Sequence, residues 1–191
     1  MQALKERILA EGRYLGGGIL KVDSFINHRV DAGLMMACGQ ELARRFASTH
    51  PQKVFTAEIS GIAPALATAY HLGVPLVFAR KHRPVTMPDQ IFRTLTPSHT
   101  KGREVELMVS PEYLHAGEHI LIIDDFLASG ETILGLVRLV QAAQAEVVGI
   151  GALIEKTFEG GRAKLEPLGV PIEALARISA LHDNGRIEFA E

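Results

Sequence analysis

The sequence of 191 residues contains a single cysteine, Cys38, no tryptophan and only 6% aromatic residues. One cysteine excludes an intrachain disulfide and any multi-cysteine metal site, so we expect no metal ion held by the protein alone. No stretch approaches the roughly 20 apolar residues that a membrane-spanning helix needs. The charged start LKERILAEGR lacks the apolar core of a signal peptide. We therefore expect a cytoplasmic protein with no membrane partner.

The chain also lacks an excess of charge of either sign. Its formal net charge is −2, with 22% charged and 47% hydrophobic residues, which is the balance of an ordinary globular domain. Nothing in this composition indicates a broad basic surface, so we expect no nucleic-acid partner. No repeat, low-complexity tract or linker divides the chain, and its length suffices for one sizeable core. We predict a single domain over residues 1–191.

Strands and helices are predicted to alternate along most of the chain. We expect strands near residues 53–58, 75–80, 119–123 and 147–154, and helices near residues 2–12, 31–48, 62–72 and 132–143. The runs ILII and VVGIGALI are apolar without alternation, as in strands covered on both faces. This order predicts an α/β fold with a mainly parallel twisted sheet that is flanked by helices.

Residues 84–118 interrupt this alternation. Prolines and a glycine surround two β-rich runs, IFRTLT and REVELMV, which flank a polar tip at residues 98–102. Long inserts of this kind in compact α/β domains are often lids over a site. We therefore expect a two-stranded flexible flap over about residues 84–110, and the alternative is a plain surface hairpin.

The most informative segment is HILIIDDFLASGET, residues 119–132. A buried strand leads to two adjacent acids, Asp124 and Asp125, and then to a turn of small residues before a helix. The carboxyl end of a parallel strand is where α/β sheets bind ligands, and a helix N-terminus offers unpaired amides to a phosphate. Because two acids would repel a phosphate, we expect them to contact sugar hydroxyls or a cation. The segment predicts a ribose-phosphate or nucleotide ligand; the alternative is an ordinary strand end and helix cap.

Other polar residues also follow predicted strands. Ser60 and Gly61 lie at a strand-to-helix turn, where they either bind an anion through backbone amides or only cap the helix. The basic run at residues 80–83 suits a polyanion, although such runs are often solvated surface. Lys156 ends a strand, where a lysine is either a surface charge or a donor to a ring carbonyl. Phe158 is positioned to stack on a base.

The thirteen residues ILIIDDFLASGET resemble the signature of type I phosphoribosyltransferases. In that family the loop holds the 5-phosphate of phosphoribosyl diphosphate (PRPP), the two acids contact the ribose hydroxyls, and Mg²⁺ accompanies the diphosphate. The resemblance implies that Asp124 and Asp125 are the catalytic acids. It assigns PRPP binding to Ala128, Ser129, Gly130, Glu131, Thr132, Ser60, Gly61, Arg80 and Lys81.

The stretches GGGILKVDSFINH, SGIAPA, PLVFARKHRPVTM, GIGALIEKTF and LARI are similar to the bacterial xanthine class of this family. This resemblance covers nearly the whole chain and implies that Leu20, Asn27 and Lys156 contact xanthine. It also implies a small hood, formed mainly by about residues 1–30 with C-terminal residues, and a homodimer. The implied reaction joins xanthine to PRPP and gives xanthosine 5'-monophosphate and diphosphate.

One position departs from many transferases that use 6-oxopurines. Those enzymes carry an aspartate that serves the purine N7, whereas this chain has Ala128, so we expect no general base there. Xanthine suits such a site because it loses a proton more readily than guanine or hypoxanthine does. The alternatives are the same reaction on guanine, hypoxanthine or adenine, and a transcription regulator that senses PRPP. The lack of a basic footprint disfavours the regulator.

Overall fold

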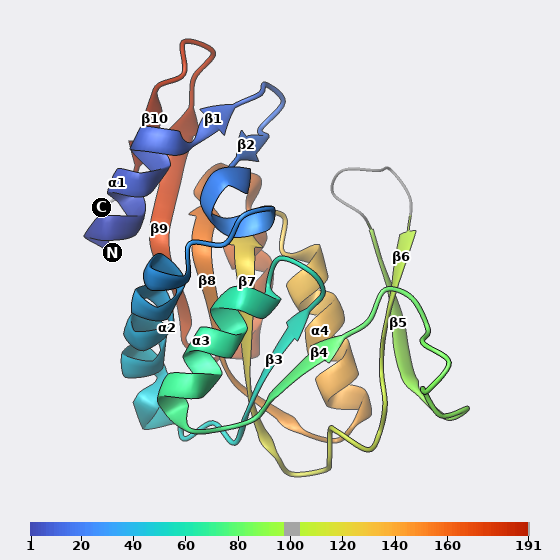
Figure 1. Ribbon diagram of the computed structural model, residues 1–191. Helices are drawn as coiled ribbons and strands as arrows, with labels where there is room; N and C mark the ends of the chain where they lie inside the picture. The colour runs from blue at the N-terminus through green and yellow to red at the C-terminus, as the bar shows by residue number, and fades with distance from the viewer. Residues whose placement is uncertain (98–103, 191) are drawn as a thin grey trace.

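The computed structural model describes residues 1–97 and 104–190 (Figure 1). A six-stranded sheet has the order β10-β9-β8-β7-β3-β4, in which β10 is antiparallel to β9 and the other neighbours are parallel. Its strands are β3 (Lys53–Ala57), β4 (Leu76–Ala79), β7 (His119–Leu127), β8 (Glu146–Lys156), β9 (Ile172–Leu181) and β10 (Ile187–Phe189). The predicted mainly parallel α/β fold is confirmed, and β9 and β10 extend the sheet beyond the predicted strands.

Helices cover both faces of the sheet, with α2 and α3 on one face and α4 on the other (Figure 1). The α-helices are α1 (Gln2–Glu11), α2 (Ala32–Phe46), α3 (Ile62–Leu72), α4 (Glu131–Ala142) and α5 (Gly161–Leu165). Short helical turns occupy Asp23–Asn27, Ala47–Thr49, Thr157–Glu159 and Glu166–Leu168. Among the described residues, no helix combines the length and apolar character that crossing a membrane requires.

The central strand β7 is covered on both faces, as its continuous apolar run predicts. Leu121 and Ile123 belong to the hydrophobic cluster that contains α2 and α3 residues, whereas Ile120 and Ile122 belong to the cluster of α4. These side chains are fully buried. Because packed side chains fill both faces, polar groups are available to a ligand at the strand ends rather than on a face.

The N-terminal segment packs on the C-terminal strands (Figure 1). Its short strands β1 (Arg13–Tyr14) and β2 (Leu20–Lys21) pair antiparallel. The turn at residues 16–18 between them consists of glycines with positive φ, a conformation that glycine adopts most readily. The Met1 amino group donates to the carbonyl of Leu175 on β9. The segment predicted to form a hood therefore contacts the C-terminal residues predicted to join it.

The two β-rich runs within residues 84–118 form the predicted antiparallel pair. β5 (Phe92–Pro97) pairs with β6 (Glu104–Val109) in a sheet of its own. The predicted polar tip at residues 98–102 lies outside the described residues. This pair stands beside α4 and apart from the main sheet (Figure 1).

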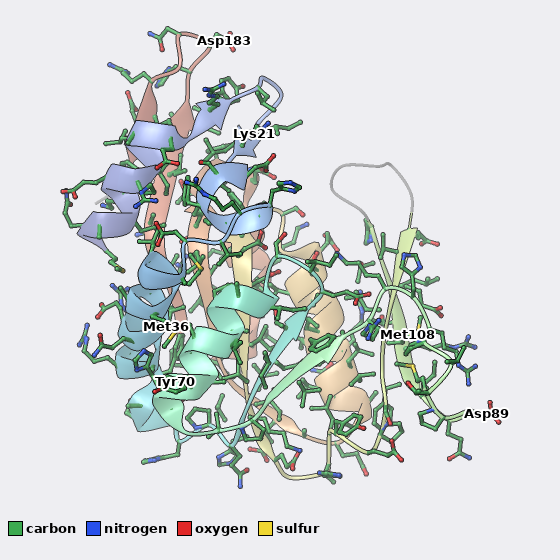
Figure 2. The ribbon with its side chains drawn as sticks, viewed as in Figure 1. Lys21, Met36, Tyr70, Asp89, Met108 and Asp183 are labelled. Atoms are coloured by element: carbon green, nitrogen blue, oxygen red, sulfur yellow. The ribbon has the colours of Figure 1, made fainter. Side chains whose placement is uncertain are left out.

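The base of the β5–β6 pair is fixed to the domain. Met108 on β6 (Figure 2) exchanges backbone hydrogen bonds of 2.8 and 3.0 Å with Arg80, which follows β4. From α4, Arg138 donates to Thr94 Oγ1 at 2.9 Å and to the Leu95 carbonyl at 3.0 Å. Movement of the whole pair as one lid would therefore break several hydrogen bonds.

Candidate active site

A cavity of about 690 Å³ opens between the N-terminal segment, the β5–β6 pair and the turn after β7. It brings together most of the predicted site residues, although they come from distant parts of the sequence. Its walls include Leu20, Asn27, Lys81, Asp124, Asp125, Ala128, Ser129, Gly130, Glu131, Thr132 and Lys156. The other predicted residues, Ser60, Gly61 and Arg80, lie outside these walls.

The turn between β7 and α4 lines the cavity. Gly130 immediately precedes α4 and has a φ of +81°, in the left-handed region that favours glycine. Glu131, Thr132 and Ile133 begin the helix and line the cavity. The first backbone amides of a helix lack partners within it, and they carry the positive end of the helix dipole. This turn, which we call the phosphate loop (residues 128–132), can therefore hold a phosphate group.

The two acids lie within a strand rather than after one. The sequence predicts a strand end at Ile123, whereas β7 continues to Leu127 because its last residues stay paired with β8. Burial raises the pKa of Asp124 well above its ordinary value, and the charge of Asp125 adds to the rise. Burial also raises the pKa of Asp125, while the ammonium of Lys81 acts to lower both. Such a pair favours a ligand that brings hydroxyl donors or positive charge.

The Ser60–Gly61 turn lies directly behind Asp124. A Cβ atom at Gly61 would lie 2.7 Å from Asp124 Oδ1 and 2.2 Å from Thr56 Oγ1, so only glycine permits this approach. Gly61, and not Ser60, is the N-cap of α3. The Thr56 hydroxyl is buried and has no hydrogen-bond partner among the described residues. Thr56 was not predicted as a site residue because a threonine near the end of a strand carries no distinctive sequence signal.

Glu58 organises the basic run at residues 80–83, a role that was not predicted from the sequence. Glu58 Oε2 lies 2.8 Å from Arg80 Nε, and Glu58 Oε1 accepts from the Lys81 backbone amide at 2.6 Å. The Arg80 guanidinium also lies over the Phe78 ring, 5.6 Å from its centroid. These contacts hold Arg80 outside the cavity walls, whereas Lys81 lines them. Glu58 follows β3 and the basic run follows the neighbouring strand β4. Opposite charges at the ends of two consecutive predicted strands were the sequence signal for this contact.

Lys156 also lines the cavity, and several contacts fix its side chain. Its ammonium donates to the Gly18 carbonyl at 2.7 Å and to Glu159 Oε1 at 3.1 Å. It also lies 5.4 Å from the centroid of the Phe126 ring. Phe126 and Glu159 line the cavity, whereas Phe158, the predicted stacking residue, does not. Lys156, Glu159 and Phe126 therefore offer a cation, a carboxylate and an aromatic side chain to a planar polar ligand.

Leu20 and Asn27 bring the N-terminal segment to the cavity wall. Leu20 on β2 is buried, and Asn27 ends a π-helical turn, a conformation that is frequent at functional sites. The Asn27 amide nitrogen donates to Asp125 Oδ2 at 3.4 Å. The predicted base contacts and the predicted ribose contacts are therefore neighbours in one cavity.

The acids fit a divalent cation that is shared with a ligand. Among residues 1–97 and 104–190, no group of three or more His, Cys, Asp or Glu side chains could hold a metal ion. Asp124 and Asp125 supply two adjacent carboxylates at the cavity. Mg²⁺ commonly takes one or two carboxylates and completes its shell with phosphate and water oxygens. The donor set therefore suits Mg²⁺ in the presence of a diphosphate.

This geometry defines a class of protein, an α/β domain whose cavity at the carboxyl edge of a parallel sheet suits a phosphorylated sugar. Residues 32–169 match the phosphoribosyl transferase domain family. The chain therefore belongs to the phosphoribosyl transferase family.

Similar proteins refine this assignment. The chain is 49% identical to a xanthine phosphoribosyltransferase of Deinococcus deserti, over 98% of this chain and 97% of the relative. It is 50% identical to a xanthine phosphoribosyltransferase of Shouchella clausii, over 100% and 95%. Among solved structures, an adenine phosphoribosyltransferase from Thermoanaerobacter pseudethanolicus superposes with a TM-score of 0.74 at 25% identity, covering 91% of this chain and 99% of that chain. The solved structure supports the fold, and the full-length relatives point to the xanthine class.

Proposed function

We propose that this protein transfers the 5-phosphoribosyl group from PRPP to xanthine, which gives xanthosine 5'-monophosphate and diphosphate. The observation that carries the proposal is the single cavity whose walls bring together the phosphate loop, the two acids and Lys156. Full-length relatives named xanthine phosphoribosyltransferase support the choice of base. The reaction belongs to purine salvage.

The donor would lie along the carboxyl edge of the sheet. The phosphate loop holds the 5-phosphate through its backbone amides and its hydroxyl side chains. Asp124 and Asp125 accept hydrogen bonds from the ribose hydroxyls. Lys81 lines the cavity near both acids and is placed to meet the diphosphate. Arg80 and the Ser60–Gly61 turn, which lie outside the cavity walls, would reach the diphosphate only through a local rearrangement.

The reaction breaks the bond from the ribose C1 to the diphosphate oxygen and forms a bond from C1 to a ring nitrogen of the base. Positive charge develops on the ribose, and the neighbouring carboxylates stabilise it. Lys81 stabilises the negative charge that gathers on the leaving diphosphate. Because Ala128 cannot accept a proton, the base reacts as an anion, a form that xanthine reaches more easily than guanine or hypoxanthine.

Mg²⁺ is the expected cofactor, and it would travel with the diphosphate. Asp124 and Asp125 are the residues that would help to hold the ion, because they are the adjacent carboxylates of the cavity. The ion would supply charge neutralisation to the diphosphate. In its presence, the raised pKa values of both acids would fall, since a cation favours the ionised carboxylate.

The same chemistry on another purine is the main alternative. Two similar solved structures are adenine phosphoribosyltransferases, and their similarity concerns the fold. Lys156 argues against adenine, because an ammonium beside the purine 6-position needs an acceptor there, and adenine presents an amino group. Guanine and hypoxanthine carry the 6-oxo group and remain alternatives that only the 2-oxo contact and the acidity of xanthine disfavour.

The proposal is tested by incubating the protein with PRPP, Mg²⁺ and each purine base in turn and measuring nucleotide formation. We expect xanthosine 5'-monophosphate as the preferred product and none from adenine. Equal use of guanine or hypoxanthine would reduce the assignment to a general 6-oxopurine transferase. No product with any base, together with specific binding of DNA in a gel shift, would favour the regulator.

We also propose that the protein is a cytoplasmic homodimer, as the family resemblance implies. The exposed apolar side chains of Met36 on α2 and Tyr70 on α3, which lie on neighbouring helices (Figure 2), are compatible with a subunit contact. Light scattering at micromolar concentration tests this proposal. A mass of one chain would contradict the dimer.

A further inference from the structure

The short helix α5 lies outside the cavity walls, and its first residue, Gly161, touches the back of the phosphate loop. The Gly161 amide donates to the Ala128 carbonyl at 3.0 Å. A Cβ atom at Gly161 would lie 2.2 Å from the Ala128 oxygen. It would also lie 2.7 Å from Gly130 N and 2.9 Å from the Ser129 carbonyl carbon. One residue of α5 therefore contacts three consecutive residues of the loop, with no room for a side chain.

Two adjacent glycines in this segment have different structural requirements. Gly160 has a φ of +72°, which favours glycine, but open space surrounds the position of a Cβ atom. Gly161 has no left-handed φ, so its backbone conformation suits any residue. Glycine is therefore needed at 160 for its conformation and at 161 for its contact with the phosphate loop.

An ion pair between Arg162 and the buried carboxylate of Glu155 fixes the position of Gly161. Glu155, the residue before Lys156, is 1% exposed. Its two carboxylate oxygens accept from Nε and Nη2 of Arg162, each at 2.7 Å. Arg162 also donates to the Ile172 carbonyl at 2.9 Å. A two-point pair of this kind fixes orientation as well as distance, so α5 is held in register with β8 and β9.

A second contact joins α5 to the start of α4. Lys164 Nζ lies 2.5 Å from Oε1 of Glu131, which belongs to the phosphate loop. Leu165 is fully buried in the same hydrophobic cluster as α4. The phosphate loop is therefore supported from behind by the close approach of Gly161 and from one side by the Lys164–Glu131 pair.

We propose that α5 is a buttress that sets the shape of the phosphate loop for the 5-phosphate of PRPP. Gly161 is a positioning residue in this device, and the Glu155–Arg162 pair holds it in place. The physical reason is that several backbone amides must reach one phosphate together, so a displacement of the loop weakens all of these hydrogen bonds together. This inference rests on the proposed function, because it takes PRPP as the ligand.

The test compares Gly161→Ala with the matched control Gly160→Ala. The first substitution pushes a methyl group into the loop, so we expect the KM for PRPP to rise, by up to about 100-fold if the loop shifts by roughly 1 Å. The KM for xanthine should stay near its wild-type value. Gly160→Ala adds a methyl group in open space, so it should leave both KM values near wild type. The positive φ at this position disfavours alanine, so the same substitution should lower thermal stability. Direct titration with PRPP should reproduce the difference between the two variants.

A second variant guards against a folding defect in Gly161→Ala. Arg162→Lys keeps the positive charge but cannot make the two-point contact with Glu155, and we expect a selective rise in the KM for PRPP there as well. Wild-type PRPP affinity in Gly161→Ala, or equal losses for PRPP and xanthine in all variants, would overturn the buttress. A wild-type protein that binds no PRPP would instead overturn the proposed function, and this inference with it.

Discussion

The Asn27 amide nitrogen lies 3.4 Å from Asp125 Oδ2, although 98 positions separate the two residues in sequence. Asn27 ends the π-helical turn of the N-terminal segment, and Asp125 belongs to the central strand β7. The contact joins the residue proposed to read xanthine to an acid proposed to hold the ribose. Because the amide nitrogen carries two N–H groups, Asn27 can keep this bond and still donate to the 2-oxo group of a base.

Replacing Asn27 by alanine should weaken the distinction between xanthine and hypoxanthine. These bases differ at the 2-position, where we propose that the amide binds. Losing one such hydrogen bond should lower the ratio of kcat/KM values for xanthine and hypoxanthine on the order of tenfold. Steady-state kinetics with both bases measure this ratio. An unchanged ratio in Asn27→Ala would remove Asn27 from base recognition.

Asp124→Asn should be nearly inactive and yet more stable than the wild type at neutral pH. Loss of one preorganised charge at the reacting centre commonly costs on the order of 100-fold in kcat. The introduced amide side chain keeps an oxygen that can accept from the Asp125 backbone amide, as the Asp124 carboxylate does at 3.0 Å. Circular dichroism should therefore show an intact fold. Near-normal activity in this variant would contradict the catalytic assignment.

The stability gain of Asp124→Asn should depend on pH in a defined direction. Burial, with the charge of Asp125, raises the folded-state pKa of Asp124, so the folded protein binds more protons here than the unfolded chain. The free energy of unfolding therefore falls as pH rises from the ordinary pKa through the raised one. Asparagine does not ionise, so the melting temperature of the variant should gain on the wild type as the pH rises from the ordinary pKa of an aspartate to neutral pH. Parallel melting curves across that range, measured in metal-free buffer, would contradict this linkage.

The β5–β6 pair should show two classes of hydrogen exchange. The Met108 amide is hydrogen-bonded to Arg80, so it should exchange slowly with or without ligand. Residues 84–91 form no helix or strand, and they should exchange quickly until a PRPP analogue binds. Arg138→Ala removes the bonds to β5 and should speed exchange over Phe92–Pro97. Slow exchange at residues 84–91 in both states would argue against a lid.

The layers of this fold were accessible from sequence because buried parallel strands leave an unmistakable apolar pattern. The apolar runs at residues 120–123 and 147–154 predicted β7 and β8. The helix predicted near residues 31–48 corresponds to α2, with Asp31 as its N-cap. The predicted end of β7 was wrong. Two adjacent acids indicated the end of the strand, although the backbones of Asp124 and Asp125 remain in it. Pairing with a neighbouring strand is a tertiary effect, which the polarity of one segment does not reveal.

The candidate site was predictable where one segment carries the chemistry, as in the phosphate loop. Contacts between distant segments were not. Glu58 contacts Arg80, and Glu159 contacts Lys156, but a lone glutamate in sequence is usually solvated. The role of Gly161 depends on a close approach to Ala128 that only the folded chain shows. Phe158 was predicted to stack on the base, whereas Phe126 lines the cavity instead.

Lys156→Ala should strongly lower kcat/KM for xanthine, whereas adenine should remain a poor substrate. The Lys156 and Glu159 side chains are only 11% and 15% exposed, so the ammonium acts in a largely desolvated environment. Truncating one partner of such a buried charged contact costs on the order of 2–5 kcal/mol, and we expect a loss of that size in kcat/KM for xanthine.

Two substitutions separate the charge of Lys156 from its packing. Lys156→Met keeps an unbranched chain over Phe126 but removes the ammonium, so it should lose xanthine activity as Lys156→Ala does. Glu159→Gln leaves the ammonium in place and keeps an oxygen 3.1 Å from it in the wild-type geometry, so its loss should be smaller. Kinetics with xanthine, guanine, hypoxanthine and adenine in all three variants give the comparison. Since the 6-oxo group is common to the first three bases, Lys156→Met should lower activity with each of them. If Lys156→Met uses xanthine as well as the wild type does, Lys156 serves the N-terminal segment through Gly18 and not the base.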